Sequence, residues 1–366
     1  MMKQLQRGAS FGWLSVSCGG FLLMALAHPA AASVKQSLVT PLATITEGNA
    51  FYIVHVEGSG GDLGRYTATT GPSHPAGSGL NVLFGNGSPG TTFNTVRSYT
   101  TNTDYVQGTG PTSSNPVVDL SPFGSTVAIG TTGVRTTYVL PGGATTPDAL
   151  TIVQDVNVNG TTFANSTVEV TTKVTNNSTA GPVQIGIRYE WDFEIANDDG
   201  PTFQAINPNG AVLTNETQFL PPAFESYRME DNNPPNAPTF DVFGTVTGPA
   251  SVTPTPTAPD LLQYVAWPHA IGTAFDYTVN PTLDIATPGG VDDSAVLYFF
   301  GHNSAAAIAV PSGQTRTVSA SLFLRQAAPL APVTRAPALN GGALVVLAML
   351  LGGGGVWVLT KKQGMA

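Results

Sequence analysis

Four charged side chains alternate along one stretch of the chain, and their spacing could support chemistry. The segment Val183–Ile195 reads VQIGIRYEWDFEI and places Arg188, Glu190, Asp192 and Glu194 at even positions. Same-face neighbours on a β-strand lie about 6.6–7 Å apart, a separation at which two carboxylates can serve as acid and base on a sugar. The simpler interpretation, which we favour because no flanking catalytic motif is present, is the solvated face of an amphipathic strand.

An acidic turn follows this segment. Asn197-Asp198-Asp199-Gly200 carries oxygen donors of the kind that hold Ca²⁺ in weak extracellular sites, so Asp198 and Asp199 are candidate metal ligands. The same residue types also build ordinary turns without an ion, and this interpretation is favoured. We therefore expect no cofactor, with Ca²⁺ as the alternative. The stretches Asp292-Asp293 and Glu230–Asn233 are acidic in the same way.

The other catalytic motifs that we considered are incomplete or absent. His55-Val56-Glu57 matches only the opening of the zinc deaminase signature, which also needs a Pro-Cys-X-X-Cys, and the one cysteine is Cys18 near the N-terminus. No nucleophile elbow and no phosphate-binding loop is present. A sugar-directed enzyme would need His269 or His302 within hydrogen-bond reach of a carboxylate in one cleft.

The elements that must position these residues are β-strands. Apolar residues occupy every odd position of Val183–Ile195, and strict alternation of this length predicts a strand with one face in a core. Similar short runs recur between Gly, Pro and Asn punctuation. They are Phe51–Val56, Leu80–Phe84, Val96–Tyr99, Ser125–Ile129, Arg135–Leu140, Thr151–Val158, Thr167–Thr175, Glu225–Met229, Val242–Val246, Leu261–Trp267, Phe275–Val279, Ala295–Phe300 and Thr317–Arg325.

The predicted fold is all-β, a large antiparallel sandwich. About fourteen runs exceed the seven to nine strands of an immunoglobulin-sized domain, so the choice is between one supersandwich and two tandem sandwiches. The Pro-rich stretch Thr247–Pro259 would be the boundary between two domains, or a long loop within one. We favour a single sandwich. Thr167–Thr175 is predicted to form a hairpin with Val183–Ile195, in the register that places Glu169 opposite Arg188, because other registers oppose like charges.

Composition limits the function. Only 10% of the 366 residues are charged and the formal net charge is −9, which excludes a nucleic-acid partner because few basic residues are available for phosphates. A charge-poor, Gly- and Pro-rich chain with one cysteine is typical of an exported bacterial β-protein without disulfides.

The two ends indicate export and anchoring. Lys3 and Arg7 precede an apolar run that ends in Ala30-Ala31-Ala32, which predicts a signal peptide over residues 1–32. Residues 33–327 would form the extracytoplasmic sandwich, and residues 328–340 a Pro-rich spacer. Gly341–Thr360 contains no charge and is long enough to span a bilayer, and the basic tail 361–366 should stay cytoplasmic.

Two resemblances add to these expectations. Ala336–Leu339, the apolar stretch and the final basic residues resemble the C-terminal sorting tails of the IPTL-CTERM and PEP-CTERM families. That resemblance implies transit to the cell surface and an exosortase-type sorting enzyme as a partner. The strand and loop texture of the body also resembles, faintly, the galactose-mutarotase-like supersandwich.

The sequence favours a cell-surface or envelope-anchored protein with a structural or interaction role, attached to the membrane by its C-terminal helix, over an enzyme. The alternatives are a carbohydrate-binding module, with surface polysaccharide as partner, and a mutarotase-like sugar enzyme. A binding module should carry an exposed Tyr or Trp beside Glu190 and Asp192.

Overall fold

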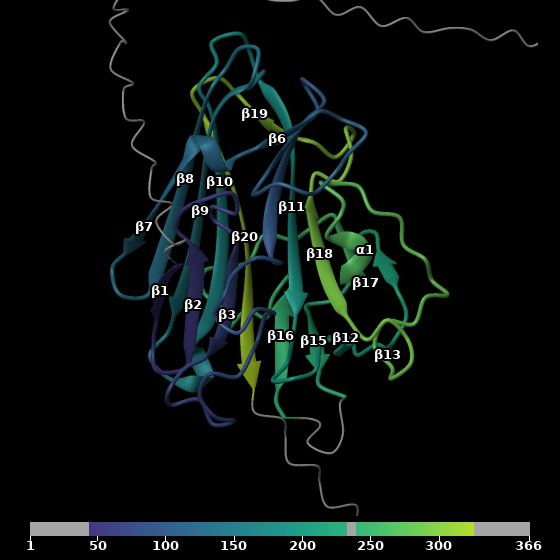
Figure 1. Ribbon diagram of the computed structural model, residues 1–366. Coiled ribbons are helices and arrows are strands. Elements are labelled where there is room, and N and C mark those ends of the chain that lie inside the picture. Colours follow the sequence, from purple (N-terminus) through teal and green to yellow (C-terminus); the bar gives the residue numbers. More distant parts are fainter. Residues whose placement is uncertain (1–43, 233–238, 326–366) are drawn as a thin grey trace, which may run out of the picture. The chain divides into compact units, whose positions relative to one another are not determined.

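The computed structural model of the chain describes residues 44–232 and 239–325 (Figure 1). Regular structure in these ranges is almost entirely β-strand, in three sheets whose strands pair antiparallel apart from β5 and β6, so the all-β prediction is confirmed. The predicted signal peptide (1–32), the spacer (328–340), the sorting helix (341–360) and the basic tail (361–366) all lie outside the described residues. Within the two described ranges, no helix combines the length and hydrophobicity needed to cross a membrane.

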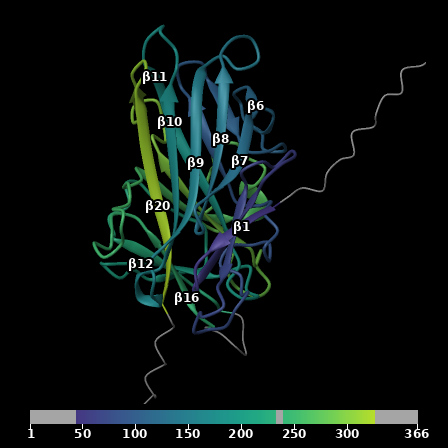
Figure 2. The same ribbon diagram turned by 90° about the vertical axis from the view of Figure 1, so that its left-hand side faces the viewer.

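The larger sheet has nine strands, and its long central members lie side by side in Figure 2. β10 is paired along both of its edges, because β9 forms a long antiparallel ladder with one edge and β20 with the other. In spatial order the strands are β13 (Val212–Leu213), β12 (Thr202–Ile206), β15 (Ser226–Glu230), β16 (Asp241–Thr245), β20 (Thr315–Arg325), β10 (Thr167–Asn176), β9 (Ala149–Asn159), β8 (Gly133–Pro141) and β7 (Gly124–Ile129).

The second sheet has eight strands and is built around β11 (Val183–Phe193), the strand that the alternating segment predicts. β18 and β19 pair with successive parts of one edge of β11, and β4 pairs with the other edge. In order the strands are β14 (Thr217–Phe219), β17 (Leu261–Ala266), β18 (Ser294–Phe300), β11, β4 (Phe93–Ser98), β5 (Thr103–Val106) and β6 (Val117–Asp119), with β19 (Ile308–Val310) off this path.

The remaining elements are short. β1 (Thr44–Gly48), β2 (Tyr52–Glu57) and β3 (Tyr66–Thr70) form a small third sheet. The helical turns are η1 (Ser121–Phe123), η2 (Phe163–Asn165) and α1 (Trp267–Ala270). Pro268 stands in the first turn of α1, where a missing backbone N–H costs nothing, and it ends the predicted strand run one residue early.

One apolar core fills the space between the two large sheets. The odd-numbered residues of β11 supply much of it, and Tyr189, Trp191 and Phe193 are fully buried there. The nine-stranded sheet contributes mainly β-branched and aromatic residues from the opposite side, among them Tyr138, Val156, Val168 and Val170. Period-two alternation therefore identifies the core face of β11 correctly.

The described strands form a single sandwich. The Pro-rich stretch Thr247–Pro259 joins β16 of the nine-stranded sheet to β17 of the eight-stranded sheet. Each of these sheets contains strands from before and after this stretch, so it is a connection between layers and no domain boundary.

The predicted hairpin between β10 and β11 is wrong. The two strands belong to different sheets, and the chain between them crosses from one layer to the other. Glu169 lies opposite Asn157 and Ser321, while Arg188 lies opposite Thr95 and Phe299. Both edges of β10 are already taken by β9 and β20, so no edge is left for β11.

Candidate functional site

The charged face of β11 is covered, which corrects the expectation of a solvated face. Arg188 and Glu190 are 0% exposed and Asp192 is 1% exposed. The segment between β17 and β18, residues 267–293, provides part of the cover, because its Phe275 packs in a cluster with apolar residues of both strands. The predicted strand at Phe275–Val279 is an irregular part of this covering segment.

Arg188 and Glu190 form an ion pair with each other beneath the cover. The Arg188 guanidinium also donates to the Thr273 hydroxyl (2.8 Å) and to the Phe275 carbonyl (3.1 Å), so it ties the covering segment to the sheet. Burial lowers the pKa of Arg188 to about 9. The side chains of Glu190 and Asp192 are both buried. A substrate therefore cannot reach them as an acid–base pair in this arrangement.

A second arginine holds the same segment. Arg97 on β4 contacts Asp104 through two N–O distances of 2.6 and 2.8 Å, and contacts Asp276 of the covering segment at 2.7 Å. Its guanidinium also lies 4.3 Å from the centre of the Phe275 ring, within the range of a cation–π contact. The cover is thus fixed by ionic contacts as well as by apolar packing.

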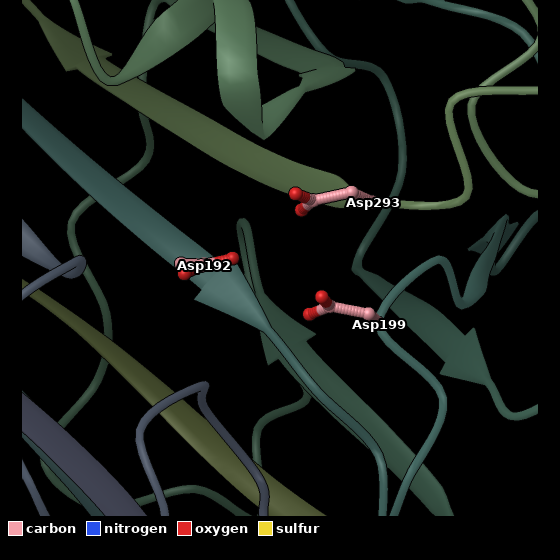
Figure 3. A group of neighbouring side chains, drawn as sticks. All are labelled: Asp192, Asp199 and Asp293. Atoms are coloured by element: carbon pink, nitrogen blue, oxygen red, sulfur yellow. The ribbon is translucent and has the colours of Figure 1, made fainter.

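Three carboxylates meet where β11 ends. Asp192 is the penultimate residue of β11, Asp199 lies in the turn that follows, and Asp293 immediately precedes β18. One carboxylate oxygen from each lies within 4.8 Å of the other two, and Figure 3 shows the three groups turned toward one shared space. We call these three residues the acidic cluster.

Local structure explains why the cluster forms. Ala196 adopts a left-handed φ of 58°, and reciprocal backbone hydrogen bonds between Ile195 and Asp198 close a tight turn. The turn brings Asp199 back toward the sheet, where its carbonyl accepts a hydrogen bond from the N–H of Ser294 (2.9 Å). Pairing of β11 with β18 then places Asp293 beside residues that are a hundred positions earlier in the chain.

Burial and mutual repulsion raise the pKa of all three carboxyl groups. Burial raises the pKa of Asp199 to about 6 and that of Asp293 to about 7, and neighbouring carboxylates add to both shifts. Burial holds the pKa of Asp192 well above its usual range, with Asp293 and Asp199 adding to the effect. The nearby Thr91 hydroxyl opposes this shift, although it makes no hydrogen bond of normal geometry. Such an arrangement can accept hydrogen bonds from hydroxyl groups or bind a cation.

The other predicted site residues have structural roles. Asp198 accepts hydrogen bonds from the N–H groups of Gly200 (3.2 Å) and Asn232 (2.6 Å), so it stabilises its own turn. Glu194 accepts a hydrogen bond from the Asn81 amide (2.7 Å) and borders the cluster. Of the predicted metal pair, only Asp199 is part of the cluster, and it is joined there by Asp192.

Two aromatic residues that the sequence did not single out as site residues flank the acidic cluster. The backbone N–H of Phe84 donates to the Asp192 carbonyl (3.0 Å), and that of Trp267 donates to the Asp293 carbonyl (3.3 Å). Their rings stack, with centroids 6.4 Å apart and an interplanar angle of 21°, and both side chains are partly exposed. The Trp267 indole N–H has no hydrogen-bond partner.

The histidines lie elsewhere. His302 Nδ1 is 3.0 Å from a carboxylate oxygen of Asp260, so one of the two histidines does reach a carboxylate. Asp260 also accepts hydrogen bonds from the N–H groups of Gly301 and His302, and it therefore caps the turn after β18. Asp293 stands at the other end of β18, about 20 Å away for a strand of seven residues. His269 is exposed on α1.

Two cavities open on other parts of the sandwich. One, of about 540 Å³, lies between β14 and residues 277–281, and one of about 220 Å³ lies between the loops around Thr100, Asp148 and Gly181. Neither cavity is lined by Arg188, by Glu190 or by the acidic cluster.

Comparison with known proteins adds little about function. No family model and no curated protein matches the sequence. Among solved structures, a putative aldose 1-epimerase from Escherichia coli K12 is 12% identical with a TM-score of 0.46, covering 78% of this chain and 100% of its own. A galactose mutarotase related enzyme from Lactobacillus acidophilus is 9% identical with a TM-score of 0.43, covering 78% and 98%. A galactose mutarotase-like protein from Lactobacillus casei is 10% identical with a TM-score of 0.41, covering 77% and 100%.

These neighbours are of the kind that the strand texture of the sequence resembles. At TM-scores of 0.41–0.46 they carry no argument about substrate or activity. The class that the described residues define is a double-sheet antiparallel β-sandwich with a partly buried acidic cluster at the end of its central strand.

Proposed function

We propose that this chain is an exported, envelope-attached β-sandwich protein that binds carbohydrate at the acidic end of β11. The observation that carries the proposal is the position of the stacked pair Phe84 and Trp267. Each ring belongs to a residue whose backbone N–H is hydrogen-bonded to a carbonyl of the acidic cluster. Two residues with partly exposed aromatic rings are therefore tied through their backbones to residues of the acidic cluster.

This combination matches the chemistry of sugars. The C–H face of a pyranose packs on an aromatic ring, and its hydroxyl groups donate hydrogen bonds to carboxylate oxygens. Asp199 and Asp293 are both partly exposed, and each also has a buried carboxylate oxygen, Oδ1, without a hydrogen-bond partner. We expect ligand hydroxyls to reach these carboxylates from the exposed side of the two residues.

Replacing Trp267 tests the proposal. We expect Trp267→Ala to raise the Kd of a neutral oligosaccharide at least about tenfold, because it removes the aromatic surface. Trp267→Phe should retain part of the affinity. The measurement is isothermal titration calorimetry against a panel of neutral hexoses and their oligosaccharides.

A matched control is Val127→Ala on β7, which removes an exposed apolar side chain that belongs to another sheet. This variant should bind as the unchanged protein does. The carbohydrate proposal would be overturned if the protein bound no sugar of the panel at millimolar concentration, or if the Trp267→Ala variant bound with the same affinity as the unchanged protein. Either result would favour a purely structural role.

The export and anchoring part of the proposal rests on the two ends of the sequence. The signal-like residues 1–32 and the uncharged stretch 341–360 with its basic tail support secretion, membrane attachment and processing by an exosortase-type enzyme.

Deleting residues 341–366 should move the protein from the membrane fraction to the soluble extracytoplasmic fraction, because the only long uncharged apolar stretch after the sandwich is removed. Cell fractionation followed by immunoblotting measures this. Membrane association that is unchanged by the deletion would contradict the anchor.

A further inference from the structure

The acidic cluster holds more negative charge than its surroundings balance. Asp192, Asp199 and Asp293 take part in none of the ion pairs formed by the described residues. The charged groups that influence them most are themselves acidic, namely Glu194, Asp198 and Asp292. An arginine or lysine that could neutralise the cluster is missing from this list of neighbours.

The state of Asp192 is a second, independent observation. This side chain is 1% exposed, and its oxygen Oδ1 makes no hydrogen bond of normal geometry, even to the nearby Thr91 hydroxyl, which is itself unpaired. Buried carboxylates are normally paired, hydrogen-bonded or bound to a metal ion, since leaving water without a partner is costly. Figure 3 shows the Asp192 carboxylate beside the space that Asp199 and Asp293 also face. The unsatisfied oxygen therefore points to a ligand that the cluster surrounds.

The donor atoms restrict the kind of ligand. All three groups offer carboxylate oxygens, which suit hard cations, and the cluster contains no sulfur or imidazole donor of the kind that zinc prefers. Oxygens up to 4.8 Å apart can share a Ca²⁺ ion, whose bonds are about 2.3–2.6 Å long. A Mg²⁺ ion demands near-ideal octahedral geometry and gives up its water molecules reluctantly, whereas Ca²⁺ accepts irregular sites of protein oxygens, so Ca²⁺ is the better match.

We propose that Asp192, Asp199 and Asp293 bind a Ca²⁺ ion. Asp192 forms the buried floor of the site, and the partly exposed Asp199 and Asp293 leave coordination positions open toward solvent. Those positions take water molecules, or hydroxyl oxygens of a bound ligand. The ion site shares Asp199 and Asp293 with the proposed carbohydrate site but needs none of its aromatic residues, so Ca²⁺ binding can be tested without a sugar.

Binding of the ion should also stabilise the fold. The three ligands come from the end of β11, the turn after it and the residue before β18, and they are brought together only in the folded chain. A ligand that binds the folded state alone raises the melting temperature as its concentration exceeds the Kd. We expect a rise on the order of 5 °C at about a hundred times the Kd.

The test uses the full-length chain, purified in EDTA and titrated with CaCl₂ without any sugar. We expect calorimetry to give a Kd for Ca²⁺ between about 10⁻⁶ and 10⁻³ M. Bound Tb³⁺ should show luminescence sensitised by Trp267, because the backbone N–H of Trp267 is hydrogen-bonded to Asp293. Asp199→Asn and Asp293→Asn should each weaken Ca²⁺ binding at least about tenfold. Glu47→Gln on β1, which removes one negative charge from another sheet, is the matched control.

The same variants check that the fold is intact. In EDTA, Asp199→Asn and Asp293→Asn should melt at or above the temperature of the unchanged protein, because each removes one of several repelling charges. The proposal would be overturned if the protein bound no detectable Ca²⁺ or bound Mg²⁺ more tightly than Ca²⁺. It would also be overturned if the two variants melted at lower temperatures in EDTA, or if Glu47→Gln lost as much Ca²⁺ affinity as they do. Loss of sugar binding by Trp267→Ala with unchanged Ca²⁺ affinity would leave the ion site standing.

Discussion

Replacing Arg188 with methionine should lower the free energy of unfolding by about 3–5 kcal/mol. Arg188 and Glu190 are both fully buried and paired with each other. The substitution would leave the Glu190 carboxylate in an apolar environment without its counter-charge, and it would remove the two hydrogen bonds that hold the covering segment. Chemical denaturation followed by tryptophan fluorescence measures the loss.

The double variant Arg188→Met/Glu190→Leu separates charge from packing. Leu297 and Phe93 lie opposite Glu190, so an apolar side chain at this position has apolar neighbours on both adjoining strands. Buried ion pairs replaced by apolar residues of similar size are often neutral or stabilising, and we therefore expect the double variant to regain most of the lost stability. A double variant as unstable as Arg188→Met alone would show that the cost comes from lost packing.

Alternation alone was enough to predict the central strand and its core face. Each apolar odd residue of β11 packs between the sheets, because period two is a property of the extended backbone that needs no tertiary information. The partner strands of β11 were beyond this kind of reasoning. A turn-like stretch between two alternating runs fits a hairpin as well as a crossing between sheets, and the competing ladders of β9 and β20 decide the outcome.

The sequence contains a sign that the charged face of β11 is buried, but that sign lies in another strand and not in β11 itself. The neighbouring run Ala295–Phe300 is apolar at every position, which is typical of a strand buried on both faces. Ala295, Leu297 and Phe299 lie opposite Asp192, Glu190 and Arg188. An outer face that alternates charged residues on one strand with large apolar residues on the next cannot be left in water, so it had to be covered.

Part of the acidic cluster was predictable from the local sequence, and part depends on contacts between distant segments. The turn that carries Asp199 was predictable from its composition, and Asp192 stood out on its strand. Asp293 joins them only because β18 pairs with β11. Trp267 lies near Asp293 because it directly follows β17, which pairs with β18. Composition showed that Asp292-Asp293 is acidic, but tertiary structure is required to place it beside Asp192.

His74 should make the protein less stable in mild acid. Its side chain is 5% exposed, its Nδ1 accepts a hydrogen bond from the Ala76 N–H (3.1 Å), and its ring meets the rings of Phe163 and Phe240 at 5.1 and 5.5 Å. Burial lowers the pKa of His74 from 6.5 to about 4. Between these two values the unfolded chain binds a proton that the folded chain refuses, so stability is complete above pH 6.5 and falls as the pH approaches 4.

The loss attributable to His74 should reach about 2–3 kcal/mol near pH 4. His74→Phe keeps an aromatic ring and removes the titrating group, so its free energy of unfolding should fall less between pH 7 and pH 4 than that of the unchanged protein. The lost hydrogen bond to Ala76 would lower the whole curve by a constant amount and leave its slope unaffected. Denaturation curves at several pH values give the difference, with the exposed His269→Gln as a control that should follow the unchanged protein. Parallel pH curves for the protein and its His74→Phe variant would show that the pKa of His74 is the same in the folded and unfolded chains, and would contradict the prediction.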